Sequence, residues 1–207
     1  VGSQARDALK HVEAIEACVQ LLKKARREKL GPLDVLDIGG GFPIDYAQRV
    51  PEIGRFCAPI RKALAGVPKD VRVIAEPGRF IAGPAAIGVA SVMGRAEREG
   101  LWWYYLDDGL YGSWNGQMYD HASYPIESLK KSDDQRPSVL AGPTCDSIDV
   151  IAENILLPKL KVGDLVIGKA MGAYTWASAS EFNFFPRATV VSVNETPGDT
   201  GKVEPQG

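Results

Sequence analysis

A short apolar segment followed by three consecutive glycines is the feature that most constrains how this chain can fold. The segment contains Val35, Leu36 and Ile38, which predicts a buried strand, and residues 39–41 are all glycine. Glycine adopts backbone conformations closed to other residues, so several N–H groups of such a loop can point at one anion. The same residues also suit a tight turn against a neighbouring segment. Taken alone, they leave both interpretations open.

The composition excludes several classes of protein. The 207 residues are 45% hydrophobic and 24% charged, as in an ordinary globular protein. A formal net charge of -2 argues against a nucleic-acid surface or a polybasic membrane patch. No apolar run approaches the roughly 18 residues of a membrane helix. The few cysteines and histidines lack metal-ligand spacing, so we expect no metal site and reduced thiols in a cytoplasmic protein.

The first part of the chain predicts alternating helices and strands. We expect helices over residues 6–30 and 52–65, and a second strand before Ala75. The first helix carries one apolar stripe, made of Leu9, Val12, Ile15, Val19 and Leu22. This order is typical of a parallel sheet or barrel, in which ligands bind at the carboxyl ends of strands. The opening residues contain neither an initiator Met nor a signal peptide, and we expect them to be the middle of a longer chain.

The pattern changes near residue 84. Short apolar segments without long helices between them follow, at residues 87–92, 101–106, 138–140, 165–167 and 189–193. Such spacing predicts an all-β module, so we place a domain boundary between residues 83 and 84. Residues 195–207 are rich in glycine, proline and charge, and we expect a flexible tail there.

Two strand ends carry residue types suited to a phosphate ester. Glu76 and Arg79 flank Pro77-Gly78, where they can close a turn as an ion pair. Beside a phosphate loop, Arg79 can instead bind the phosphate, and Glu76 can keep a ring nitrogen protonated. Further along the chain, Asp120 needs a partner if it is buried, whereas His121 suits a surface or structural position.

A cysteine beside a carboxylate forms another candidate site. Cys145 precedes Asp146, but no histidine lies nearby in the sequence to activate the thiol as a nucleophile. A thiol that acts as an acid, or one that packs in a site wall, is an equal alternative. Tyr174 can donate its hydroxyl to an anion or fill the core. Each of these clusters is ambiguous by itself.

Five motifs in one order resolve that ambiguity. They are Gly39-Gly40-Gly41-Phe42-Pro43, Glu76-Pro77-Gly78-Arg79-Phe80, Tyr119-Asp120-His121, Gly142-Pro143-Thr144-Cys145-Asp146 and Met171-Gly172-Ala173-Tyr174. The chain resembles the ornithine decarboxylase branch of the pyridoxal-phosphate-dependent decarboxylases, over nearly its whole length. The resemblance implies an α/β part followed by an all-β part: the C-terminal part of a (β/α)8 barrel over residues 1–83, and a β-sandwich or β-barrel domain over residues 84–194.

The resemblance also implies roles for individual residues. It assigns the phosphate of pyridoxal 5'-phosphate to Ser3, Gly39, Gly40, Gly41, Arg79 and Tyr174. It assigns the ring nitrogen to Glu76, protonation of the substrate Cα to Cys145, and the substrate to Tyr119, Asp120, Asp146 and Phe182. The carboxylates of Asp120 and Asp146 would bind the distal ammonium of L-ornithine or L-lysine. The Cys-Asp segment would enter the active site of a partner subunit, so the resemblance implies a homodimer.

One element of the family pattern is missing. The family uses a lysine on an early barrel strand to hold its cofactor, and no lysine of this chain lies in a matching motif. We therefore expect a fragment of a decarboxylase of polyamine biosynthesis, inactive without the N-terminal half of the barrel. The alternative is a non-catalytic homologue that binds a regulatory partner.

Overall fold

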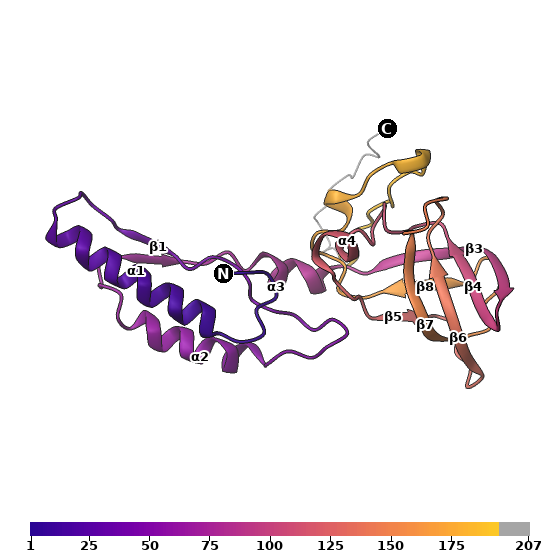
Figure 1. Cartoon of the computed structure of the whole chain (residues 1–207), viewed down its shortest axis with the longest axis horizontal. Helices are drawn as coiled ribbons and strands as arrows, with labels where there is room; N and C mark the ends of the chain where they lie inside the picture. Colours follow the sequence, from indigo (N-terminus) through magenta and orange to yellow (C-terminus); the bar gives the residue numbers. More distant parts are fainter. Residues whose placement is uncertain (195–207) are drawn as a thin grey trace.

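The computed structural model describes residues 1–194, and its outline is elongated (Figure 1). Helices and a two-stranded sheet from the first part of the chain lie at one end, and a larger sheet lies at the other. The tail expected at residues 195–207 lies outside the described residues. No helix among the described residues has both the length and the apolar character needed to cross a bilayer.

Two helices pack together in the N-terminal region. Helix α1 spans Leu9–Arg27 and helix α2 spans Ile53–Leu64, where the Glu52 carboxylate accepts hydrogen bonds from the first free backbone N–H groups. The buried face of α1 contains Ile15 and Val19, as predicted, but it also contains His11. The inclusion of Leu9 in the stripe was wrong, since its side chain is 58% exposed. Leu9 lies about 200° around the helix from His11, and it therefore faces solvent.

The two N-terminal strands form an incomplete layer. Strand β1, Val35–Asp37, pairs in parallel with β2, Arg72–Ile74, which confirms the predicted parallel arrangement. Only Leu36 of these strands is buried, whereas Val73 and Ile74 are 38% and 40% exposed. The predicted burial holds for Leu36 but was wrong for Val35, which is 40% exposed because it lies on the opposite face of the strand. Helix α3, Gly78–Ala82, and a 3-10 turn, Gly83–Ala85, follow β2.

The second region is built on one mixed six-stranded sheet. Its strands are β3 (Gly88–Arg98), β4 (Leu101–Leu106), β5 (Ile126–Ser128), β6 (Gln135–Ala141), β7 (Val150–Pro158) and β8 (Leu165–Gly168). They lie in the order β5-β8-β3-β4-β6-β7, with only β4 and β6 parallel. The edge strands β5 and β7 contact each other, so the sheet curls into a nearly closed barrel. Tyr104, Leu106 and Leu140 are fully buried in its core.

The all-β character of this region is confirmed, one of its two alternatives holds, and two details of the prediction were wrong. The described residues from 84 to 194 form one curled sheet, so the barrel alternative holds and the sandwich does not. Strands β5 and β7 were not predicted. Residues 189–193 are irregular, with Val191 74% exposed, because an apolar segment becomes a strand only where a neighbouring strand pairs with it. The boundary at residues 83–84 stays a prediction.

Candidate functional site

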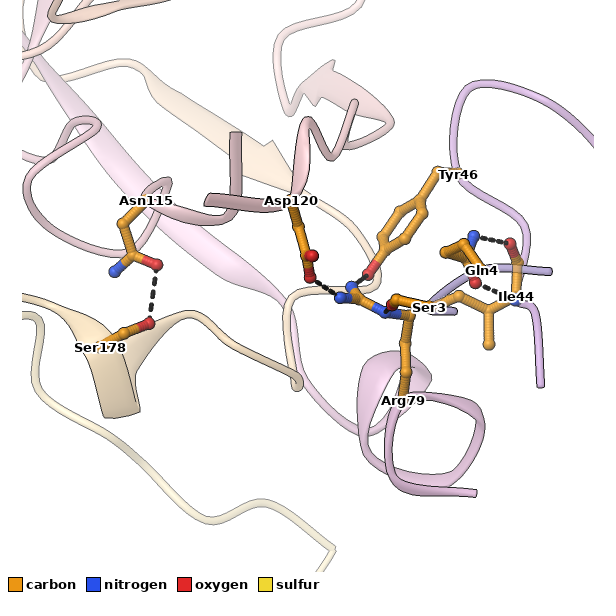
Figure 2. Close-up of polar contacts among 8 residues, drawn as sticks. All are labelled: Ser3, Gln4, Ile44, Tyr46, Arg79, Asn115, Asp120 and Ser178. Carbon is orange, nitrogen blue, oxygen red and sulfur yellow. Dashed lines mark hydrogen bonds and ion pairs between the residues drawn. The ribbon is translucent and has the colours of Figure 1, made fainter. Parts of the chain in front are cut away.

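The guanidinium of Arg79 is the centre of a polar cluster built from five separate segments, and Figure 2 shows its contacts with Ser3, Tyr46 and Asp120. Arg79 lies on α3 and is only 6% exposed. Its Nε donates to Ser3 Oγ at 3.3 Å and its Nη1 to Tyr46 Oη at 2.6 Å. Its Nη2 forms an ion pair with Asp120. The ring of Tyr174 lies 4.7 Å from the guanidinium carbon. The interpretation in which Arg79 pairs with Glu76 is therefore wrong.

Two side-chain clamps bring these segments together. Gln4 donates to the carbonyl of Ile44 at 2.9 Å and accepts from its N–H at 2.8 Å, which fixes the loop that carries Tyr46 (Figure 2). Asn115 precedes helix α4, Gly116–Asp120, and donates to the carbonyl of Thr175 at 2.8 Å. It also accepts from Ser178 Oγ at 2.9 Å. The segments that carry Asp120 and Tyr174 are thereby joined.

The glycine loop packs tightly beside this cluster. Gly39 and Gly41 have φ values of 69° and 84°, which side-chain-bearing residues rarely adopt. A Cβ on Gly41 would lie 2.4 Å from the carbonyl oxygen of Gly2, and one on Gly40 would lie 2.8 Å from that of Glu76. Glycine is therefore required here for two reasons, conformation and close approach. The loop lies against the residue before Ser3 and against the end of β2, where an anion cradle was predicted.

Sequence reasoning missed His11, which contacts the backbone of this loop from helix α1. Its Nε2 lies 2.8 Å from the carbonyl oxygen of Gly40, and its ring packs against Phe42 and Phe56. The side chain is fully buried. The signal was available, because His11 lies one helical turn before Ile15 on the face that α1 buries.

A pyridoxal phosphate fits the residues of this cluster. A buried guanidinium flanked by hydroxyl groups is the donor set that a phosphate ester requires, and Ser3, Arg79 and Tyr174 supply it. Gly78 lies next to this hydroxyl, since a Cβ on it would be 3.9 Å from Tyr174 Oη, an ordinary contact distance. Glu76 is exposed, and no described side chain forms a hydrogen bond or ion pair with it. Its carboxylate is thus free to face a ligand.

The predicted substrate and acid residues form a second cluster, on the sheet region alone. Tyr111 donates to Asp146 Oδ2 at 2.5 Å and stacks on Phe182 with ring centroids 4.1 Å apart. Asn183 donates to Cys145 Sγ at 3.4 Å. Hydrogen bonding to Asp146 raises the pKa of Tyr111 to about 12. The same bond, with a further one from a backbone N–H, lowers the pKa of Asp146. Tyr111 was not predicted as a site residue.

A buried carboxylate holds the two loops of this second cluster. Asp149 is 2% exposed and accepts from Leu110 N at 2.7 Å and from Thr144 N and Oγ1 at 3.1 and 2.7 Å. A Cβ on Gly109 or Gly142 would lie 2.3 or 2.2 Å from Asp149 Oδ1. Glycine at both positions lets the carboxylate enter. Asp149 therefore connects the loop that carries Tyr111 to the loop that precedes Asp146.

Not every predicted residue joins these clusters. Asp120 was assigned to a substrate but contacts Arg79, whereas Tyr119 beside it is 71% exposed. No hydrogen bond or ion pair within residues 1–194 links the Arg79 cluster to Cys145 or Asp146. A groove of about 720 Å³ lies between β3, β4 and residues 185–189; residues 142–144, which precede Cys145, also line it, but none of the predicted site residues does. The described residues contain no group of three or more ligands that could hold a metal ion.

A comparison with protein families matches one description, the C-terminal sheet domain of pyridoxal-dependent decarboxylases, to residues 33–172. The lysine/ornithine decarboxylase of Selenomonas ruminantium is 38% identical over 199 residues, which cover 95% of this chain and 50% of that protein. Antizyme inhibitor 2 of Xenopus laevis is also 38% identical, over 92% of this chain and 45% of its own length. The chain thus spans about half the length of the relatives it matches.

Solved structures give the same result. The lysine/ornithine decarboxylase of Vibrio vulnificus, complexed with cadaverine, is 58% identical with a TM-score of 0.92, over 94% of this chain and 54% of its own. The same protein complexed with putrescine gives a TM-score of 0.90 over 94% and 53% of the two chains.

Proposed function

Because the chain belongs to the family of pyridoxal-dependent decarboxylases, we propose that it forms part of an enzyme that decarboxylates L-ornithine or L-lysine to a diamine in polyamine biosynthesis. The observation that carries the proposal is the Arg79 cluster. Its guanidinium and hydroxyls are suited to the phosphate of pyridoxal 5'-phosphate, and the glycine loop lies beside it. The matched relatives support the reaction.

The bound cofactor supplies an electron sink that lets the substrate carboxylate leave as CO2. In the proposal, Ser3, Arg79 and Tyr174 hold its phosphate with the backbone of residues 39–41. Glu76 holds a proton at the ring nitrogen, since its exposed carboxylate follows the cofactor-side end of β2.

Cys145 and Asp146 act on the substrate in this scheme. Asp146 binds the distal ammonium, and its lowered pKa keeps the carboxylate charged across the neutral range. Cys145 returns a proton to Cα after CO2 leaves, and its thiol is exposed. Because Cys145 and Asp146 lie apart from the Arg79 cluster, we propose that they serve the active site of a second subunit in a homodimer. Tyr119 and Phe182 are assigned to the substrate side of the same interface.

The N-terminal region supports a proposal about the parent chain. Strands β1 and β2 are parallel and connected through α2, and the apolar side chains of Val35 and Ile74 are each 40% exposed on the face opposite Leu36. We propose that they are the last units of a (β/α)8 barrel, which another part of a longer cytoplasmic protein completes. That part would supply the cofactor-holding lysine.

The choice between the two substrates depends on one methylene group. Structures of the Vibrio relative contain cadaverine and putrescine, the diamines that differ by that group. A pocket discriminates one methylene by only about 1–3 kcal/mol. We therefore propose that both amino acids are substrates.

Joining the chain to the upstream half of its parent tests the proposal. The joined protein is expected to release CO2 from ornithine or lysine and to bind pyridoxal 5'-phosphate. Arg79→Met in the same protein should abolish cofactor binding, whereas Asp134→Asn, on an exposed ion pair, should not. A joined protein that carries the lysine but releases no CO2 from either amino acid would contradict the proposal.

A second candidate function is regulation through binding. The relative named antizyme inhibitor 2 favours it, since its identity to this chain equals that of the Selenomonas enzyme. The two functions separate at one residue, because only an enzyme needs the cofactor-holding lysine upstream of Val1. A parent chain without that lysine, which binds a protein partner but no pyridoxal 5'-phosphate, would establish the second function instead.

A further inference from the structure

Within the described residues, each of the three nitrogens of Arg79 donates one hydrogen bond to an acceptor of the chain, which leaves two of its five N–H groups. Ser3 and Tyr46 offer neutral hydroxyl oxygens at 3.3 and 2.6 Å, and Asp120 offers a carboxylate. A buried guanidinium requires a counter-charge or several hydrogen bonds. Arg79, at 6% exposed, has both. Of these partners, Asp120 alone is charged, and it gives the cation its single ion pair in residues 1–194.

A phosphate and Asp120 compete for the same cation. A phosphate monoester carries between one and two negative charges at neutral pH, and like charges that share a buried site repel each other strongly. Arg79 cannot neutralise both anions. Asp120 therefore weakens the binding of the proposed cofactor for as long as its carboxylate stays paired with the guanidinium.

Asp120 is placed so that it can leave. It is the last residue of α4, a helix of five residues, and its side chain is 33% exposed. The next residue, His121, has a φ of 51° and ends the helix in the left-handed region. A carboxylate at an exposed helix end can change rotamer without disturbing the core.

Tyr46 is held firmly by contrast. Its ring packs edge-on against Tyr124 at 5.5 Å, and Tyr124 packs in turn against buried Trp114. The N–H of Ala47 donates to the carbonyl of Ser123 at 3.0 Å, which attaches the Tyr46 loop to the sheet region. The hydroxyl of Tyr46 carries no charge, so it orients Arg79 without competing with a bound anion.

We propose that Asp120 occupies on Arg79 the place that the cofactor phosphate takes, so that phosphate binding releases Asp120 as a carboxylate for the substrate ammonium, while Tyr46 keeps Arg79 in position. This inference rests on the proposed function and adds an order of events to it. The cofactor binds first, and its binding frees a group that recognises the substrate. Tyr46 becomes a positioning residue that acts through Arg79.

The test is a binding titration of the 207-residue chain with pyridoxal 5'-phosphate and, separately, with inorganic phosphate, by calorimetry. Asp120→Asn removes the competing charge with little change in shape, and it should bind both ligands about tenfold more tightly. Tyr46→Phe keeps the ring and its packing but loses the acceptor of Arg79 Nη1, so it should bind both ligands about tenfold more weakly, and its Tm should fall because a donor of buried Arg79 loses its partner. Asp134→Asn is the matched control, since Asp134 pairs with Arg136 on the surface.

The outcomes separate this inference from the proposed function. The proposed exchange of Asp120 for phosphate is wrong if the Asp120→Asn variant binds the two ligands no more tightly than the Asp134→Asn variant. It is also wrong if neither variant binds either ligand detectably. Arg79→Met that binds phosphate as tightly as the unchanged chain overturns the phosphate site itself, and with it the proposed function. If Arg79→Met loses binding while Asp120→Asn gains none, the site stands and the exchange is wrong. Unchanged circular dichroism establishes that each variant is folded.

Discussion

The two clusters of predicted site residues are assembled in opposite ways. The Arg79 cluster takes its members from five segments between Ser3 and Tyr174, and it forms only where the N-terminal region meets the sheet region. The cluster of Tyr111, Cys145 and Asp146 lies wholly on the sheet region. Its loops are connected by the buried carboxylate of Asp149.

This difference determines what each cluster depends on. The Arg79 cluster is polar, and in our proposal one of its members, Asp120, is displaced by phosphate. It requires two regions to keep their relative position. The Cys145–Asp146 cluster requires only that its own loops stay closed around Asp149. A substitution within one region should therefore affect one cluster and leave the other unchanged.

The largest effect is expected from Asp149→Ala. The substitution leaves the buried Leu110 N and the two partly buried donors of Thr144 without an acceptor. A buried unpaired donor costs about 1–3 kcal/mol, so we expect the free energy of unfolding to fall by about 3 kcal/mol, measured by urea denaturation. The binding of inorganic phosphate at Arg79 should change little in the folded protein.

An equal loss of stability from Asp134→Ala would contradict this prediction, since Asp134 is an exposed carboxylate in a surface pair. Loss of phosphate binding by folded Asp149→Ala would break the separation between the two clusters.

A matched pair of glycine substitutions compares the two regions directly. A Cβ on Gly142 would overlap Asp149 Oδ1 at 2.2 Å, whereas a Cβ on Gly39 meets nothing within 4 Å and is opposed only by its φ of 69°. Overpacking costs about 1–3 kcal/mol and the left-handed conformation about 1–2. We expect Gly142→Ala to destabilise the chain more than Gly39→Ala, as measured by the urea midpoint. The reverse order would show that the positive φ of Gly39 costs more than the overlap of a Cβ on Gly142 with Asp149.

The sequence predicted local structure well and spatial partners poorly. Apolar spacing located α1 and α2, and the glycine run was placed correctly after β1. Strand β7 was missed because its alternation is interrupted by Glu153 and Asn154 in the middle of the strand. Residues 189–193 have the composition of a strand but no neighbour among the described residues, and pairing is not a property of one segment.

The candidate site shows the same limit. Motifs identified Arg79 and Asp120, but their sequence separation of 41 residues hid the ion pair between them. Tyr46, Tyr111 and Asp149 were missed because each acts through a contact that packing creates, and a lone tyrosine or aspartate carries no pattern. Tertiary geometry, rather than residue type, makes them part of a site.

The smallest effect is expected at the partly buried hydrogen bond between Tyr111 and Asp146. The bond lowers the pKa of Asp146 and raises the pKa of Tyr111 to about 12. Its stabilisation is complete above the unfolded carboxyl pKa of about 4 and is lost as the pH falls through the lowered value in the folded protein. At the alkaline end, it is complete below pH about 10 and is lost as the pH rises toward 12.

Tyr111→Phe should move the pKa of Asp146 up toward its ordinary range, as followed by carbon NMR of the labelled carboxyl. Asp70, paired with Arg26 at 2.6 Å, serves as the internal control, since its lowered pKa should not move. An unmoved Asp146 would show that its backbone hydrogen bond from Ile148 holds the charge instead, and that Tyr111 is only a packing partner of Phe182.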